Sequence, residues 1–424
     1  MGTNAGLRDP TRHITEVNLA AEIFDASQVQ LSETYPVSGS TSKDPRLTFG
    51  VEYEMALGTL RDICENPSPE DGRKVYGVAR AINSSPLDYD PRPSSFGHSS
   101  EEECAYRNEN RRFVYESIAQ TLHCAGFPAV HVEDPEYKES GYTAAMAKKW
   151  IIGVDHSITY PDEAIYDFHQ IEIKSPVFYF SEGAICDITR VWELIASTYK
   201  VVVNESMGLH VHVGNGVDAF DGETLRNLWA IFWTTEKWIA TIHPLHRTFS
   251  TFCRGFHDCS NLEEKVGGQS LKNPAGEVLE RKVLEWILGR TPPSVEEFLD
   301  TISIHSGAYN FVHLQKSHNV GSIKRTIEFR QHEATLDVER VKQWVRVCIG
   351  LVRASTSADP TKLDPYLRQL VQKQREKVRV GDILSELGLK ASGSYYKAQV
   401  PRERGPVRTA VDKSLNRIAR FLNG

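Results

Sequence analysis

Apolar residues recur at every third or fourth position in several stretches, which is the spacing of helices with one buried face. The clearest of these stretches covers 188–202 and leads directly into the apolar segment GLHVHVG. The same spacing predicts helices over 100–126, over 222–242 and after Asp337, whose side chain can cap the first turn. Residues 356–424 are predicted to be further helical decoration.

Other stretches alternate polar and apolar residues, as strands with one buried face do. They contain the motifs GVEYEMAL, WIIGVDHSI, HQIEIKSP, GLHVHVG and TIEFRQHE. The strands are interspersed with helices, and several have the character of hairpins. This pattern predicts an α+β fold rather than a doubly wound parallel sheet.

Composition shifts divide the chain into a tail or arm over 1–45, one domain over 46–355 and an extension over 356–424. Within the domain, the stretch 66–98 is rich in proline, serine and acidic residues. Irregular loops of this kind often cover a functional site, so this insertion is a candidate lid.

The composition excludes several classes of partner. The 49 lysines and arginines against 56 acids are scattered, so no nucleic-acid footprint is expected. Apolar runs fall short of the roughly 20 residues of a membrane span, and the first residues lack a secretory signal. The 7 cysteines show no CxxC spacing, which argues against a disulfide framework and a cysteine zinc site. A soluble, cytoplasmic protein is expected.

Residues two apart on a strand point to the same side, and this chain repeatedly has polar residues at that spacing. An alternating pair is commonly just the solvent face of a sheet. If the faces converge, however, carboxylates, imidazoles and a guanidinium would form one site. The residues concerned are Glu52 and Glu54, His210 and His212, Glu328 and Arg330, and Glu172 on a fourth strand.

Such a set suits Mg²⁺ or Mn²⁺, and it has more ligands than one ion needs, which indicates two or three. Guanidinium groups beside it would bind phosphate or carboxylate. This is the inventory of phosphoryl transfer, although the sequence has no GxxxxGK[ST] phosphate loop.

The ordered series of motifs resembles the amidoligase family, carboxylate–amine ligases related to glutamine synthetase and glutamate–cysteine ligase, over about 47–355. The resemblance implies a curved antiparallel sheet that holds ATP and two or three ions on its inner face, with helices on the outer face. The metal ligands it implies are Glu52, Glu54, Glu172, His210 and Glu328. The residues it implies near the nucleotide, the transferred phosphate or the substrate carboxylate are His212, Arg247, Arg325 and Arg330.

Asp155 would face the amine and help to remove its proton. Two positions depart from the family pattern, namely His156, where a glycine is usual, and His313, where an asparagine is expected. The implied reaction is ATP-dependent amide or isopeptide bond formation between a carboxylate and an amine or ammonia through an acyl phosphate, in a protein that can form oligomers.

Two alternatives stay open on the sequence alone. The histidine pair with Glu328 would also suit iron or zinc in a cupin-like oxygenase or a hydrolase. A non-catalytic small-molecule binding protein could retain the same fold.

Overall fold

The structure is a computed structural model that describes residues 47–61, 65–73, 75, 101–161, 163, 165–267, 276–301, 307–314, 324–373 and 378–400. The predicted tail over 1–45 lies outside these residues, as does 76–98 of the candidate lid. The last part of the predicted helical extension, 401–424, also lies outside them.

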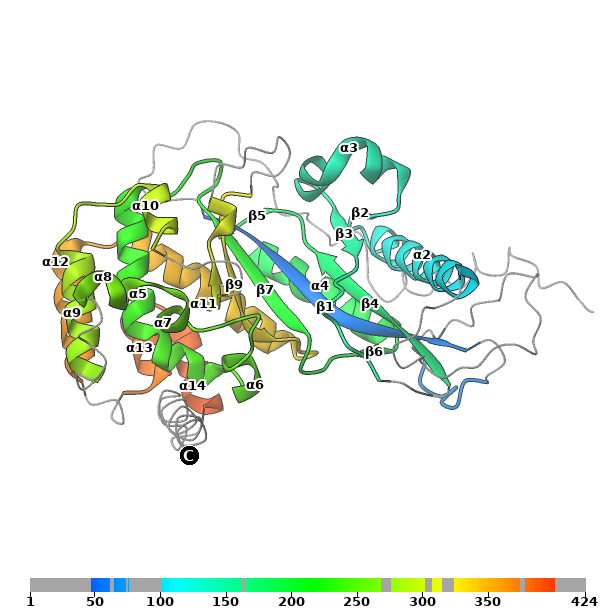
Figure 1. Ribbon diagram of the computed structural model, residues 1–424. Helices are drawn as coiled ribbons and strands as arrows, with labels where there is room; N and C mark the ends of the chain where they lie inside the picture. Colours follow the sequence, from blue (N-terminus) through cyan, green and yellow to red (C-terminus); the bar gives the residue numbers. More distant parts are fainter. Residues whose placement is uncertain are drawn as a thin grey trace, which may run out of the picture.

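One open sheet forms the centre of the protein, in the order β2-β3-β4-β1-β7-β9-β8, and the short strands β5 and β6 also pair with β1 (Figure 1). Neighbouring strands are antiparallel except β2 and β3. The predicted combination of helices with a mostly antiparallel sheet is therefore confirmed. The strands are β1 Thr48–Leu60, β2 Ala129–His131, β3 Trp150–Gly153, β4 Tyr166–Lys174, β5 Phe178–Tyr179, β6 Val201–Val202, β7 Gly208–Gly214, β8 Tyr309–Asn310 and β9 Thr326–Glu333.

Helices cover one face of the sheet. The ring of Tyr53 on β1 stacks on Trp192 of α4, with ring centroids 4.4 Å apart. Phe329 on β9 likewise meets the edge of Trp344 on α11. Because side chains alternate along a strand, the residues on either side of Tyr53 and Phe329 point to the opposite face. Glu52 and Glu54 lie on either side of Tyr53, and Glu328 and Arg330 lie on either side of Phe329.

The predicted helices form, with some differences in their ends. Asp337 caps α11 by accepting hydrogen bonds from two backbone N–H groups of the first turn. The prediction of a helix over 188–202 is wrong at its C-terminal end, because the chain becomes extended at Tyr199 and then pairs with β1 as strand β6. The helices are α2 Glu101–Cys124, α3 Pro135–Met146, α4 Glu182–Thr198, α5 Gly222–Ile239, α6 Leu245–Thr248, α7 Phe256–Cys259, α8 Leu262–Gly267, α9 Gly276–Leu288, α10 Val295–Leu299, α11 Val338–Thr356, α12 Pro360–Gln372, α13 Val380–Glu386 and α14 Lys390–Gln399, with short 3₁₀ turns at Ala240–Ile242 and Val312–Leu314.

The strand expected in WIIGVDHSI is shorter than the motif, since β3 ends at Gly153. An Asx-type turn follows, in which Asp155 Oδ1 accepts the Ser157 N–H at 2.7 Å. The turn carries Asp155 beyond the end of the strand rather than within it.

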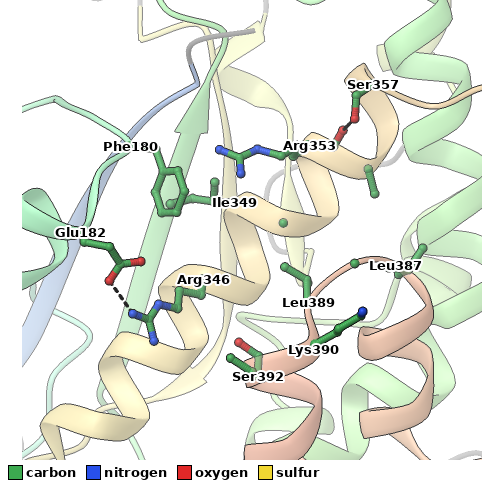
Figure 2. A pocket seen from close by; sticks show the side chains of 14 residues that line it. Phe180, Glu182, Arg346, Ile349, Arg353, Ser357, Leu387, Leu389, Lys390 and Ser392 are labelled. Carbon is green, nitrogen blue, oxygen red and sulfur yellow. Dashed lines mark hydrogen bonds and ion pairs between the residues drawn. The ribbon is translucent and has the colours of Figure 1, made fainter. Parts of the chain in front are cut away.

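A cavity of about 310 Å³ lies on the helix-covered side, between the start of α4, α11 and the junction of α13 and α14 (Figure 2). Its lining includes Arg346, Arg353 and Lys390. Figure 2 shows Arg346 directed at Glu182 and Arg353 directed at Phe180. Among the described helices, none is both long and apolar enough to cross a membrane.

Candidate active site

The polar pairs of the sequence converge on the sheet face opposite α4 and α11. Glu52 on β1 lies opposite Lys174 on one neighbouring strand and His210 on the other. His212 lies in turn opposite Glu328 on β9. All these side chains except Lys174 are buried, and Glu328 is only 2% exposed. The site is therefore built into the centre of the sheet rather than on its loops.

The central donor group consists of Glu52, His210 and Glu328. His210 Nδ1 lies 3.7 Å from Glu52 Oε2 and 3.5 Å from Glu328 Oε1. Its other nitrogen, Nε2, lies 3.5 Å from Glu54 Oε1. The imidazole is thus surrounded by carboxylate oxygens at distances that leave room for little more than an ion between them.

A second group joins His212, His313 and Glu328. His313 Nε2 lies 3.4 Å from Glu328 Oε2, and the same oxygen accepts a hydrogen bond of 2.8 Å from the Asn310 amide. On the other side, His212 Nδ1 is 3.0 Å from the Thr326 hydroxyl. These contacts fix the orientations of both rings and of the Glu328 carboxylate.

The third group contains Glu54, Asp155 and Glu172. Glu54 and Glu172 are directly opposite each other on β1 and β4, and Asp155 reaches them from the turn after β3. Glu54 Oε2 also accepts the N–H of Gly208 at 2.7 Å, which ties this carboxylate to the start of β7. In all three groups the ligand atoms lie within 4.8 Å of one another.

Cationic side chains surround the acids. Lys174 Nζ lies 2.8 Å from Glu172 and 3.5 Å from Glu52, and Lys324 Nζ lies 3.1 Å from Glu52. Arg330 is paired with Glu328 through Nη1. Its Nε donates to the carbonyl of Phe252 at 3.2 Å, which holds the guanidinium in position.

Arg247 is buried next to the same cluster. Its Nη2 donates to the Arg330 carbonyl at 2.6 Å. A Cβ at Gly208 would lie 2.7 Å from His210 Nε2 and 2.9 Å from Arg247 Nη2. The first glycine of GLHVHVG is therefore required because the imidazole and the guanidinium both pass over it.

The carboxylates experience opposite electrostatic environments. Burial raises the pKa of Glu52, but the nearby Lys324, His212 and Lys174 outweigh it and hold the pKa well below its usual value. Burial and the charge of Glu52 raise the pKa of Glu172 to about 7, although Lys174 opposes this shift. Crowded buried carboxylates favour the binding of a cation among them. The charge of Lys174 alone is not enough to keep the pKa of Glu172 at its usual value, so a further positive charge would stabilise this carboxylate.

A cavity of about 350 Å³ opens beside Glu52 and His212. Lys174 and Lys324 line this cavity. The hydroxyl-bearing residues Thr48, Ser175 and Thr326 line it as well. Its remaining wall is more apolar and includes Val177, Tyr179, Tyr142 and Val217. The cavity connects the acidic cluster to a space large enough for part of a small-molecule ligand.

The family match follows this geometry. Residues 45–352 match the family model described as "putative amidoligase enzyme". The chain belongs to the amidoligase family. The resemblance drawn from the sequence motifs is thereby confirmed, and with it a ligase type of activity. No curated protein and no solved structure matches this amidoligase significantly.

The predicted site residues of the amidoligase differ in where they lie. The five implied metal ligands come together with His212, Asp155 and Arg330, and Arg247 lies beside them. Arg325 does not join the cluster, since it is exposed and its Nη1 donates to the Val217 carbonyl at the cavity wall. Its φ of 50° marks a tight turn just before β9.

Sequence reasoning did not select Lys174 and Lys324 as site residues. Lys174 could have been found, because it lies two residues after Glu172 on the same strand face. Lys324 continues the spacing of Thr326 and Glu328 in the sequence, but it lies before β9 begins, beyond the turn at Arg325. His313 had been noted only as a departure from the family pattern, and it is a member of the second donor group.

Proposed function

We propose that this amidoligase is an ATP-dependent carboxylate–amine ligase that forms an amide or isopeptide bond and releases ADP and phosphate. The observation that carries the proposal is the set of three donor groups at one sheet face, whose members are buried except for the half-buried Asp155 and His313. Lysines and arginines flank these groups. An open, mostly antiparallel sheet with its donors on one face is also what a likeness to glutamine synthetase would require.

Mg²⁺ or Mn²⁺ fits these donors. Carboxylates with an occasional imidazole suit hard divalent ions that keep some positions for phosphate oxygens. His210 Nδ1 has no hydrogen-bond partner in the described part of the chain, yet it faces oxygens of Glu52 and Glu328. Divalent ions held by these residues would supply neutralisation of charge on the transferred phosphoryl group.

The chemistry assigns roles to the remaining residues. A carboxylate oxygen attacks the terminal phosphorus of ATP, ADP leaves, and the amine then attacks the acyl carbon as phosphate departs. Arg330, with Arg247 beside it, would stabilise negative charge on the phosphoryl group and orient the acid. Asp155, which is only half-buried, is our candidate to accept the proton that the amine loses.

A rival reading draws on the second donor group, since His212, His313 and Glu328 form a set that iron or zinc also prefers. An oxygenase or hydrolase built on that set would leave Glu54, Asp155 and Glu172 without a role. It would also turn over its substrate without ATP.

Incubation with ATP, Mg²⁺ and pooled carboxylates and amines, followed by mass spectrometry of the products, tests the proposal. Amide products that appear only with ATP and in step with ADP are expected. For Glu328→Ala we expect ADP formation to fall at least about 1,000-fold with the circular dichroism spectrum retained, because Glu328 belongs to two donor groups. Full activity of that variant would refute the metal assignment, and turnover without ATP would favour the rival reading.

A further inference from the structure

Two lysines from separate parts of the chain meet at one carboxylate oxygen. Lys174 Nζ, from β4, lies 3.5 Å from Glu52 Oε1, and Lys324 Nζ, from the segment before β9, lies 3.1 Å from the same atom. His212 Nε2 lies 3.2 Å from it as well. Lys174 Nζ also lies 2.8 Å from Glu172 Oε2, so the two ammonium groups together balance two carboxylates. Divalent ions held by the same carboxylates would leave both ammonium groups in need of another anion.

Both ammonium groups are sheltered from water. The side chains of Lys174 and Lys324 are 24% and 12% exposed, and the Lys324 ammonium also lies 5.4 Å from the centre of the Tyr142 ring. A lysine combines a point charge with a flexible stem, so its ammonium can move to another partner close by. The 350 Å³ cavity, which both lysines line, offers the space for that partner.

Binding of a divalent ion at Glu52 would bring a third positive charge to this oxygen. The ion and the two ammonium groups would then repel one another unless an anion entered with the ion. A nucleoside triphosphate brings several negative charges at once, whereas a simple carboxylate brings one. The hydroxyl groups of Thr48, Ser175 and Thr326 on the cavity wall can donate to phosphate oxygens.

We propose that Lys174 and Lys324 bind the phosphate chain of the nucleotide, and that their ammonium groups compete with a divalent ion for Glu52. The inference rests on the proposed function and extends it, because it assigns the cavity to the nucleotide. With the nucleotide in the cavity, the part of the site formed by Glu54, Asp155 and Arg247 remains available to bind the acid and amine substrates.

The test measures binding rather than turnover. The probe for the nucleotide is a non-hydrolysable ATP analogue with Mg²⁺ in isothermal titration calorimetry, applied to the whole chain and to Lys174→Met and Lys324→Met. Each variant is expected to lose at least about tenfold in nucleotide affinity, since a charge-assisted contact to phosphate is removed. Lys200→Met is the matched control, because Lys200 lies over the Tyr166 ring rather than in the cavity, and its affinity should be unchanged.

A second measurement follows Mn²⁺ alone by electron paramagnetic resonance. Without nucleotide, Lys324→Met should bind Mn²⁺ several-fold more tightly than the unaltered chain, because a competing charge is gone. Tighter Mn²⁺ binding with unchanged nucleotide affinity would show that the lysines only neutralise Glu52, and would overturn the inference. So would an increased KM for the acid alone. If the unaltered chain binds no nucleotide, the proposed function itself fails.

Discussion

Two cavities of the protein are lined by basic side chains, and they differ in the carboxylates that face those side chains. On the open face of the sheet, Lys174 and Lys324 meet Glu52, which is buried with only 7% exposure. On the helix-covered side, Arg346 meets Glu182, whose side chain is 68% exposed. Solvent screens the second pair but screens the first much less.

The difference distinguishes a built site from ordinary surface charge. Placing several carboxylates in a protein interior is unfavourable unless cations compensate them, so such a cluster persists only where it has a use. The cavity of about 310 Å³ on the helix-covered side is called the rear cavity below. Its residues incur no comparable cost, because Arg353 and Lys390 are exposed. Of these two cavities, only the one beside Glu52 and His212, the front cavity, therefore supports a functional assignment, although both are lined by several cationic side chains.

The largest expected effect distinguishes Glu52 of the front cavity from Glu182 of the rear cavity. Glu52→Gln removes a donor of the central group and the partner of both lysines. We expect the rate of ATP-dependent product formation to fall by at least about 1,000-fold, since divalent-ion binding and phosphate neutralisation are both impaired. Glu182→Gln makes the same chemical change at the rear cavity and should alter the rate by less than about twofold. Equal losses in the two variants would contradict the comparison.

The polar residues on the open face of the sheet could largely be predicted, because they follow the alternation of side chains along a strand. Glu52, His210 and Glu328 lie on strands whose side chains alternate, so spacing alone puts each of them opposite the apolar face. The pattern that identifies a strand thereby also identifies which polar residues share its surface. The adjacency of those strands was not available from spacing, and it came only through the resemblance to a family.

The residues outside that rule could not be predicted in the same way. Lys324 and His313 reach the cluster from segments that are not regular strands, and a residue there has no fixed direction relative to its neighbours. The end of β3 was also misjudged, because apolar periodicity does not register the Asx-type turn at Asp155. Long-range contacts made by loops depend on the packing of the whole chain.

A smaller effect concerns His332, a buried histidine on β9 whose ring contacts Trp344 of α11. Burial, helped by Arg340 and Arg247, lowers the pKa of His332 to about 3 from 6.5, while its contact with the Glu333 carbonyl opposes the shift. The unfolded chain therefore binds a proton below pH 6.5 that the folded chain does not. Stability from this group is complete above pH 6.5 and is lost as pH falls toward 3, by about 1.4 kcal/mol per pH unit.

Urea denaturation at pH 7 and pH 5.5 measures this dependence. His332→Asn should reduce the loss of unfolding free energy between the two pH values by about 1 kcal/mol. The variant also loses ring contact with Trp344, so its stability at pH 7 will be lower and only the difference between pH values is diagnostic. An unchanged difference would mean that His332 does not remain neutral in the folded protein.

The smallest effect is expected in the rear cavity. Arg353 lies over the Phe180 ring at 4.8 Å, and its side chain is exposed to solvent. Arg353→Ala should lower the free energy of unfolding by about 0.5–1 kcal/mol, the usual contribution of an exposed cation–π contact, and leave nucleotide affinity unchanged. Calorimetry with the same ATP analogue measures the second quantity. A tenfold loss of nucleotide affinity in Arg353→Ala would remove the distinction between the cavities, because an exposed cation far from the donor groups would then bind as strongly as a buried one.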